Sequence, residues 1–408
     1  MKIVITAVGV RGDVAPFTGL GRRLAEVGHQ VAVATAQAHE PLVRAAGLDF
    51  LHLRGADSSH TAWEETGAGA VLSGARQYVE MMRELCEGVL TVAEGAELLL
   101  LHHLTIPQGY AVGTALGIPT MALELFPTAM APTGDFPPAE ASLPNLGRWA
   151  NRHLDGVLRT LTAPTVRFFS DFQARLGLPA VGLNPMLRAM HQENYPVHHG
   201  FSRHVVPRPS DWRPGLEISG YWWPAVREDW TPSPELADFL ASGPPPVFVS
   251  FGSMASSDGE RLSEITAAAL RKAGVRGIVQ SGWAGLAVAD NDDVLTIGEA
   301  PHEWLFPQMA AVVHHGGAGT TGAALRAGVP AVPTPLTADQ PFWAARLKKL
   351  GVSPGSVPLR KLDADRLGEL IHRAVHEPSL SAVADAVGEQ VRSEDGAGQI
   401  VKAVELLD

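Results

Sequence analysis

The stretch that decides the fold is HHGGAGTTGAALRAGVPAVPTPLTADQPFWAARLKKLG, residues 314–351. It reads as the end of a strand, a glycine-rich turn, an apolar helix, a second strand and then the pair Asp339-Gln340. Such a turn holds phosphate when its backbone N–H groups point at the ligand. Glycine is also common at strand-to-helix turns of any α/β protein, because it adopts backbone conformations that other residues avoid. The turn alone is therefore weak evidence for a ligand site.

Polar side chains around the turn make the signal more specific. His315 adds an imidazole donor, and Thr320 and Thr321 add hydroxyl groups. Asp339 and Gln340 follow about one strand-helix unit later and carry groups that can bind the hydroxyls of a sugar. Phosphate binding at one end and polyol binding at the other predict a nucleotide-sugar site.

Length and composition exclude several classes of protein. The 408 residues suggest two or three domains, and 46% hydrophobic against 18% charged residues indicates large cores. The formal charge of −11 argues against nucleic acid or an anionic membrane as the main partner. An anionic ligand must then be held by local donors such as helix N-termini.

The cysteine count and the hydropathy pattern suggest a cellular location. Cys86 is the only cysteine, so an intrachain disulfide is impossible and a cytoplasmic enzyme is expected. The apolar start of the chain is too short, and is charged too soon, for a signal peptide. No apolar run reaches about 18 residues, so we expect no transmembrane segment.

The first half alternates between strand and helix patterns, which predicts a parallel, doubly wound sheet. Residues 55–75, rich in Gly, Ala and Ser, are expected to form a flexible loop, and the proline-rich residues 126–150 a long irregular one that leads into a helical region at about 150–176. The expected strands are 2–8, 29–35, 49–53, 97–102 and 119–125, and the expected helices are 16–26, 40–46, 76–95 and one from about 107.

The second half repeats the pattern after a proline-rich linker at 223–245. Two such α/β domains would place the carboxyl ends of their strands across a cleft, where open parallel sheets bind ligands. The expected strands are 246–250, 277–280, 294–297, 311–314 and 331–333, and the expected helices are 259–273, 341–350 and 363–376.

Five segments resemble family 1 glycosyltransferases of the GT-B fold. They are VGVRGDVAPFTGLGRRLAEVGHQV (8–31), ELADFLASGPPPVFVSFGSM (235–254), IVQSGWAGL (278–286), IGEAPHEWLFPQMAAVVHHGGAGTT (297–321) and ADQPFWAARLKKLGV (338–352). The similarity covers nearly the whole chain and is greatest to the vancomycin-group antibiotic transferases and the bacterial sterol glucosyltransferases. It implies two Rossmann-like, doubly wound domains facing a central cleft. It further implies an acceptor domain at 1–223, a nucleotide-sugar domain at 224–380 and a helix at 381–408 that crosses back to the first domain.

The resemblance also implies residue roles. Asp13 falls where these transferases keep the general base that deprotonates the acceptor hydroxyl, although an Asp here can also simply cap the helix that follows. His315 would meet the diphosphate, and Asp339 and Gln340 would bind the sugar hydroxyls. Ser253 would lie on a loop that closes over the phosphate, and Trp283 beside the nucleobase. The implied donor-binding residues are Arg11, Gly12, Ser253, Trp283, His315, Gly317, Gly319, Thr320, Asp339 and Gln340.

This chain departs from the family pattern at three positions. Ala318 and Gly319 stand where plant enzymes have a Trp-Asn pair, and Val10 stands where bacterial enzymes have a serine. One hydroxyl contact near the phosphate is therefore expected to be absent.

The acceptor is expected to lie against the first domain, near residues 60–80 and 124–150. These stretches are rich in aromatic residues, among which Trp63, Phe126 and Trp149 are the candidate acceptor-binding residues. Ordinary core packing is the alternative for most of them. Together they favour a lipophilic aglycone such as a polyketide, macrolide or sterol-like compound.

No metal or other cofactor is expected. The acidic run at 290–293 fits a DxD pattern, but it lies between two strands, where acidic turns are common. The 16 histidines show no zinc spacing. The sequence also lacks a nucleophile elbow of the GxSxG type and a GxGxxG after its first strand.

The combined prediction is an inverting, metal-independent hexosyltransferase that uses a dTDP- or UDP-sugar and glycosylates a hydroxyl of a lipophilic natural product. Antibiotic or other secondary-metabolite biosynthesis is its expected setting, and a monomer or homodimer its expected state. The alternatives are a sterol or lipid glucosyltransferase, a sugar-nucleotide epimerase of the same fold, and a non-catalytic helper of a partner enzyme.

Overall fold

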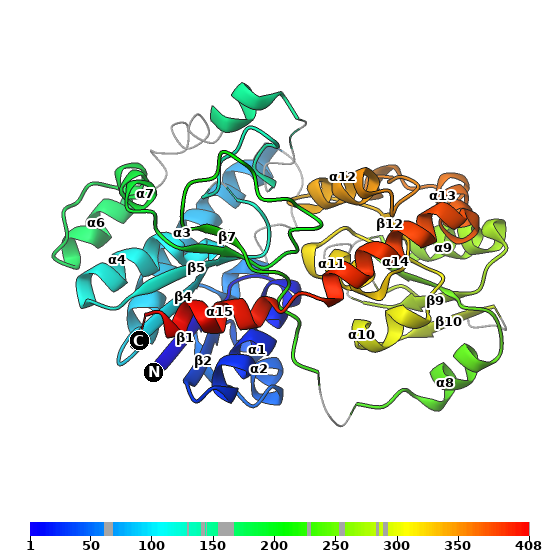
Figure 1. The fold of residues 1–408 in the computed structure, drawn as a ribbon, viewed down its shortest axis with the longest axis horizontal. Helices are drawn as coiled ribbons and strands as arrows, with labels where there is room; N and C mark the ends of the chain where they lie inside the picture. The colour runs from blue at the N-terminus through cyan, green and yellow to red at the C-terminus, as the bar shows by residue number, and fades with distance from the viewer. Residues whose placement is uncertain are drawn as a thin grey trace.

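The computed structural model consists of two α/β lobes connected by the chain near residue 220 (Figure 1). It describes residues 1–60, 68–128, 130–139, 143, 145–153, 167–226, 230–252, 258–282, 285–288 and 293–407. No helix in these ranges is both long enough and apolar enough to cross a membrane.

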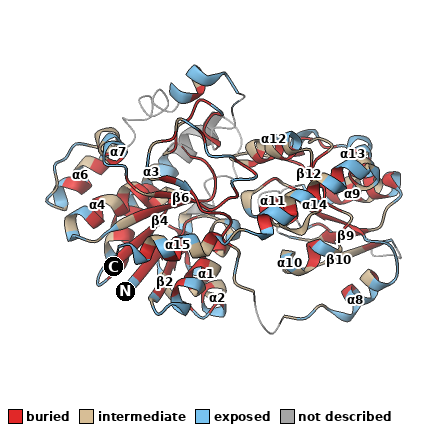
Figure 2. Ribbon diagram, viewed as in Figure 1, coloured by how far each residue is buried: buried red, intermediate tan, exposed pale blue. Residues whose placement is uncertain are grey.

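The first lobe is built on a seven-stranded parallel sheet in the order β3-β2-β1-β4-β5-β6-β7. Its central strands are buried and rich in Val, Ile and Leu, as expected for a parallel sheet that helices cover on both faces (Figure 2). The strands are β1 (Lys2–Thr6), β2 (Gln30–Thr35), β3 (Asp49–His52), β4 (Leu98–His102), β5 (Thr120–Glu124), β6 (Val197–His199) and β7 (Leu216–Ile218).

The second lobe repeats the plan with a five-stranded parallel sheet in the order β10-β9-β8-β11-β12. The predicted α/β class with two parallel sheets is confirmed. The strands are β8 (Val247–Ser250), β9 (Gly277–Gln280), β10 (Val294–Ile297), β11 (Ala311–His314) and β12 (Ala331–Pro333).

Both sheets contain a point where the strand order reverses, between β1 and β4 in the first and between β8 and β11 in the second. Parallel sheets bind ligands at such points, beyond the carboxyl ends of the strands. The turns that follow β1 and β11 therefore occupy the positions where a ligand site is expected.

Helices connect the strands and cover the sheets (Figure 1). In the first lobe they are α1 (Arg11–Glu26), α2 (Glu40–Ala45), α3 (Ala68–Val92), α4 (Ile106–Leu116), α6 (Phe168–Arg175) and α7 (Leu183–Gln192). The later helices are α8 (Pro234–Ala241), α9 (Gly259–Ala273), α10 (His302–Leu305), α11 (Ala318–Ala327), α12 (Gln340–Leu350), α13 (Ala364–His376), α14 (Pro378–Arg392) and α15 (Gly396–Glu405).

Two expectations about local structure were wrong, and a third segment contains a helix that the sequence analysis did not predict. The loop expected at 55–75 gives way to α3 from Ala68, because the alanines of this segment favour a helix more than its glycines oppose it. Helix α1 begins at Arg11 rather than near Pro16, which lies inside it. The expected linker at 223–245 contains α8, whose N-cap Ser233 accepts a hydrogen bond from the Leu236 backbone N–H.

The end of the chain connects the lobes through two helices instead of the single helix expected at 381–408. Helix α14 packs on α11 of the second lobe, and α15 packs on α1 of the first. Asp395 starts α15 by accepting a hydrogen bond from the Gly398 N–H at 2.9 Å, so the chain bends between the two helices.

The connecting segment near residue 223 lies directly against α1. A Cβ atom on Gly19 would lie 1.8 Å from the Trp223 carbonyl oxygen, so only glycine permits this approach. The Ala225 N–H donates to Thr18 Oγ1 at 3.1 Å. The first helix is thereby attached to the chain that leads into the second lobe.

Candidate active site

The turn after β11 leaves a helix N-terminus without a side-chain cap of its own. Gly317 is the N-cap of α11, and Gly316 has a φ of +89°, which favours glycine. The Gly316 N–H donates to His314 Nδ1 at 3.0 Å, which fixes the turn at its strand end. The first N–H groups of α11 thus form the kind of site that accepts a phosphate.

His315 lies between two backbone segments at this turn. A Cβ atom on Gly252 would lie 2.7 Å from His315 Nδ1, and one on Gly317 would lie 2.4 Å from Nε2. Both glycines therefore make room for the ring. Burial lowers the pKa of His315 to about 4, so the imidazole is neutral at pH 7. It can donate one hydrogen bond to a phosphate oxygen but supplies no positive charge.

Asp339 and Gln340 lie beside the same turn. Gln340 Oε1 accepts hydrogen bonds from the backbone N–H groups of Leu336 at 2.7 Å and Thr337 at 3.2 Å. Asp339 Oδ2 accepts one from Trp343 Nε1 at 2.7 Å. Burial raises the pKa of Asp339 to about 6. Hydrogen bonds from Trp343 and from the backbone of Ala318, the first residue of α11, lower the pKa and so offset part of this effect. The predicted sugar-binding carboxylate therefore adjoins the predicted diphosphate turn.

Asp13 lies in the first turn of α1, in the other lobe. The N-cap of this helix is Val10, so Asp13 does not cap a helix that follows it; instead its Oδ2 reaches back from the third helical position and accepts a hydrogen bond from the Val10 N–H at 2.9 Å. Burial, together with the negative charge of Asp339, raises the pKa of Asp13 to about 7. A carboxyl group with this pKa can exchange a proton near neutral pH, so this hydrogen bond does not exclude a role as a base.

Helix α1 of the first lobe packs against α11 of the second, and the charge of Asp339 acts on Asp13, so residues from separate lobes meet here. A second contact between the lobes is the ion pair of Arg11 with Glu299, whose nitrogen and oxygen lie 3.3 Å apart. Both side chains of this pair are exposed, so it contributes little to stability. The ion pair instead indicates where the lobes touch, because Arg11 lies at the start of α1 beside Asp13.

His302 is a site residue that the sequence reasoning missed. Burial lowers its pKa to about 4, and its neighbours His315 and Arg11 act in the same direction because they disfavour a second positive charge beside them. Its ring stacks on Phe306 with 4.3 Å between centroids. The signal available in the sequence was its place in the strand-end segment APHEW, close before the glycine turn.

Of the remaining predicted donor residues, some lie in the first turns of α11 and α1 and two are not described by the structure. Thr320 is partly buried in the first turn of α11, and Gly319 is exposed with no atom within 4 Å of where its Cβ would be. Gly12 is equally open in the first turn of α1. Ser253 and Trp283 lie outside the described residues.

The two predicted acceptor residues that the structure describes differ in exposure. Phe126 is 8% exposed, and its ring centroid lies 5.1 Å from that of His103. Trp149 is 76% exposed and stacks on His153 at 4.9 Å. Trp63 lies outside the described part of the chain. Their acceptor role stays a prediction.

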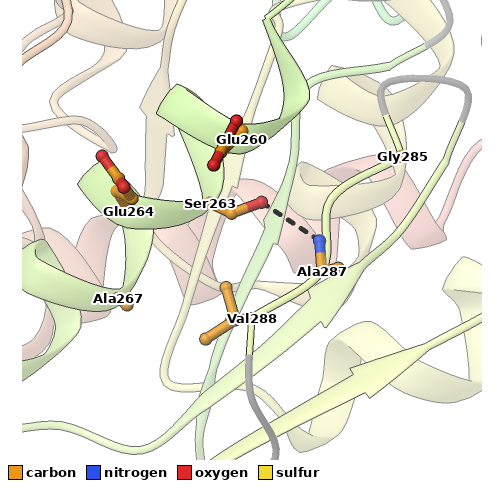
Figure 3. A pocket seen from close by; sticks show the side chains of 7 residues that line it. All are labelled: Glu260, Ser263, Glu264, Ala267, Gly285, Ala287 and Val288. Atoms are coloured by element: carbon orange, nitrogen blue, oxygen red, sulfur yellow. Dashed lines mark hydrogen bonds between the residues drawn. The ribbon is translucent and has the colours of Figure 1, made fainter.

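A hollow of about 380 Å³ lies elsewhere in the second lobe, between α9 and residues 285–288 (Figure 3). Ser263 Oγ accepts a hydrogen bond from the Ala287 N–H at 3.0 Å at its edge. None of the predicted site residues lines this hollow. Among the described residues, no group of three or more His, Cys, Asp or Glu is arranged to hold a metal ion, and Asp290, Asn291 and Asp292 fall outside them.

Comparison with family models supports both halves of the chain. Residues 3–97 match the glycosyltransferase family 28 N-terminal domain. Residues 285–407 match the C-terminal domain of erythromycin biosynthesis protein CIII-like sequences.

Two relatives align with almost the entire chain. O-mycaminosyltylonolide 6-deoxyallosyltransferase of Streptomyces fradiae is 33% identical over 97% of this chain and 95% of its own. Sterol 3-beta-glucosyltransferase UGT80B1 of Arabidopsis thaliana is 32% identical over 99% of this chain and 67% of its own. The chain spans only 30% of the length of the sterol 3-beta-glucosyltransferase of Emericella nidulans, to which it is 30% identical.

Solved structures share the fold. The glycotransferase of kitacinnamycin superposes with a TM-score of 0.74 at 17% identity, covering 99% of this chain and 98% of the other. The glycosyltransferase VinC, solved in complex with dTDP, gives 0.69 at 19% identity, covering 99% of each chain.

Proposed function

This chain belongs to the family 1 glycosyltransferases, and on that premise we propose that it transfers a sugar from a dTDP- or UDP-sugar to a hydroxyl group of a lipophilic natural product, with inversion. One observation carries the proposal. Asp13 lies on α1 of the first lobe, which packs against α11 of the second, and there the charge of Asp339 raises the pKa of Asp13 beside the start of α11, whose N-cap is Gly317. A sugar whose diphosphate lies on α11 would lie between a base and a hydroxyl-binding carboxylate.

The proposed reaction is a single displacement. Asp13 accepts the proton of the acceptor hydroxyl as its oxygen attacks the anomeric carbon of the sugar. The bond between that carbon and the diphosphate oxygen breaks, and the diphosphate leaves with the electron pair. With its pKa at about 7, Asp13 is ionised in a large fraction of molecules near neutral pH and binds a proton more strongly than an ordinary carboxylate.

The leaving diphosphate is stabilised by groups of α11. Backbone N–H groups at the helix start, the Thr320 hydroxyl and the neutral His315 ring supply hydrogen-bond donors. These donors are aimed in advance at the charge that develops on the leaving group. We propose that they act without a metal ion.

The acceptor is proposed to lie on the first lobe, against the irregular segment that follows β5. Buried aromatic residues such as Phe126 and Phe136 line this segment and favour an apolar compound. The match to a macrolide glycosyltransferase supports a polyketide or macrolide acceptor. The match to sterol glucosyltransferases makes a sterol the second candidate.

A donor and acceptor screen tests the function. The purified protein is incubated with dTDP- and UDP-sugars and with macrolide, polyketide and sterol acceptors, and products are read by mass spectrometry. We expect a product heavier than its acceptor by one sugar residue. Isomerised sugar from donor alone would instead support an epimerase, and no product with any pair would favour a non-catalytic helper.

Two further properties belong to the proposal. A cytoplasmic location is proposed, and the single, buried Cys86 supports it, since secreted proteins commonly contain disulfides. A monomer or homodimer is proposed as the assembly, and light scattering of the purified protein measures it.

A further inference from the structure

Trp343 is a fully buried side chain that contacts the predicted sugar-binding carboxylate. It lies in the first turn of α12 and has 0% exposed surface. Its indole Nε1–H donates to Asp339 Oδ2 at 2.7 Å. A hydrogen bond to an ionised acceptor is short and about twice as strong as one between neutral groups.

The indole ring is held in place from both lobes. On its own helix it packs against Phe342 with ring centroids 5.1 Å apart and nearly perpendicular planes. From the first lobe, the Phe201 ring packs against it with centroids 5.8 Å apart and 70° between the ring planes. Phe201 follows β6 and has no exposed surface. Because both neighbours are packed, the indole has little freedom to rotate away from Asp339.

The Asp339 carboxylate needs such support. Burial disfavours its charged form, as its raised pKa shows. Asp13, which carries the same charge when ionised, lies close enough for the two groups to interact. An unsupported carboxylate would relieve both penalties by protonating or by turning away. The Trp343 N–H opposes both outcomes, because it stabilises the ionised form in one orientation.

We propose that Trp343 is a positioning residue for donor recognition: its indole N–H holds the Asp339 carboxylate in the orientation that binds the sugar hydroxyls. Packing on Phe201 makes this orientation depend on how the two lobes are docked. The inference rests on the proposed function, because it takes Asp339 as the residue that binds the sugar.

The test replaces Trp343 with phenylalanine, which keeps an aromatic ring and removes the N–H. Calorimetry then measures binding of the best nucleotide sugar from the donor screen and of its nucleoside diphosphate. We expect the nucleotide sugar to bind about tenfold more weakly, corresponding to the loss of one charge-assisted hydrogen bond, and the nucleoside diphosphate to change by less than about twofold. Equal weakening of both ligands, or of neither, would overturn the inference.

A double-mutant cycle tests the named partner. In an Asp339→Asn background, Trp343→Phe should change nucleotide-sugar affinity by less than about threefold, because the carboxylate it positions is gone. A full tenfold effect in that background would show that Trp343 acts through other residues.

Trp212→Phe is the matched control. The Trp212 indole is 5% exposed and donates to the Ala131 carbonyl at 3.1 Å within the first lobe. This variant also loses the hydrogen bond of a buried indole, here to a neutral acceptor, so its melting temperature should fall as that of Trp343→Phe does. Its nucleotide-sugar affinity should stay within about twofold of the unmodified protein. If it matches the tenfold loss of Trp343→Phe, the effect reflects general loosening and the inference fails.

A second variant covers the case in which Trp343→Phe does not fold. Phe201→Leu keeps the indole N–H and alters only its packing from the first lobe. We expect nucleotide-sugar affinity to fall by about threefold with nucleoside diphosphate affinity unchanged; an unchanged nucleotide-sugar affinity would contradict the inference. The proposed function fails separately, if the unmodified protein binds neither ligand.

Discussion

The turn after β1 and the turn after β11 border equivalent points of their sheets but are completed in different ways. Both connect a buried parallel strand to a helix beside the place where the strand order reverses. At α1, the Asp13 carboxylate reaches back to the Val10 N–H. At α11, the N-cap is Gly317, and no side chain of that residue caps the helix.

This difference assigns the two turns to different chemistry. The first turn already contains a negative charge, which would repel a diphosphate but can accept a proton. The second turn presents the first N–H groups of α11, of which that of Ala318 bonds the Asp339 carboxylate, and adds a neutral imidazole beside them. A strand-to-helix turn thus supplies a base in the first lobe, and another such turn supplies an anion site in the second.

Asp13→Asn should have the largest effect. Asparagine keeps the shape of the side chain but cannot accept the proton, so we expect kcat to fall by about 10²–10⁴-fold. Nucleoside diphosphate affinity should change little, because the anion site lies in the other turn. Turnover and calorimetry on the same preparation measure both quantities. Near-normal turnover would remove Asp13 from the mechanism and leave it only its hydrogen bond to the Val10 N–H.

Thr320→Val should affect the second turn only. Valine has nearly the volume of threonine but lacks the hydroxyl, and the loss of this donor should weaken nucleoside diphosphate binding by about 1–3 kcal/mol. Calorimetry without acceptor measures it. The partner experiment is Phe126→Ala and Trp149→Ala, which should change acceptor KM or acceptor choice and spare the nucleotide. If instead these two variants lose the nucleotide and Thr320→Val binds it normally, the lobes have been assigned the wrong way round.

The pH dependence of kcat/KM tests whether Asp13 of the first turn interacts with Asp339 beside the second. Asp13 must be ionised to act as a base, so the rate should rise with pH through about 7. Asp339→Asn removes a negative charge that raises the Asp13 pKa, so the midpoint of this limb should move to lower pH. The midpoint, rather than the height, is the quantity to compare. An unchanged midpoint would show that the two carboxyl groups do not interact during turnover.

Removal of divalent metal should have no effect at all. If donors at α11 stabilise the diphosphate, EDTA leaves turnover unchanged. The assay compares rates with chelator alone and with added magnesium or manganese. Loss of activity that either metal restores would bring the acidic run at 290–293 back into consideration.

Local features of the fold were predictable from the sequence, and contacts over long range were not. The strand-helix alternation and the glycine turn depend on neighbouring residues, so their patterns predicted both parallel sheets. The strands β6 and β7 have three residues each, too few for a periodic signal. They form because they pair with β5 and with each other at the edge of the sheet.

The same contrast between local patterns and long-range contacts applies to the candidate site. His315 and Asp339 were identifiable because their motifs are short and continuous. The effect of Asp339 on Asp13, and the packing of Phe201 against Trp343, depend on how two lobes dock, which no local pattern encodes. The bend between α14 and α15 also depends on long-range contacts, because each helix packs on a different lobe.

The most direct test of the difference between the turns uses two matched glycines. Gly12 and Gly319 are both the second residue of their helices, both exposed, and neither has an atom within 4 Å of where a Cβ would be placed. Alanine at either position should therefore leave the free protein folded. Calorimetry with nucleoside diphosphate compares Gly12→Ala with Gly319→Ala. We predict about tenfold weaker binding for Gly319→Ala, because a bound diphosphate closely approaches that backbone, and a clearly smaller loss for Gly12→Ala. A larger loss for Gly12→Ala would contradict the account, since it would place the diphosphate at the turn that holds Asp13.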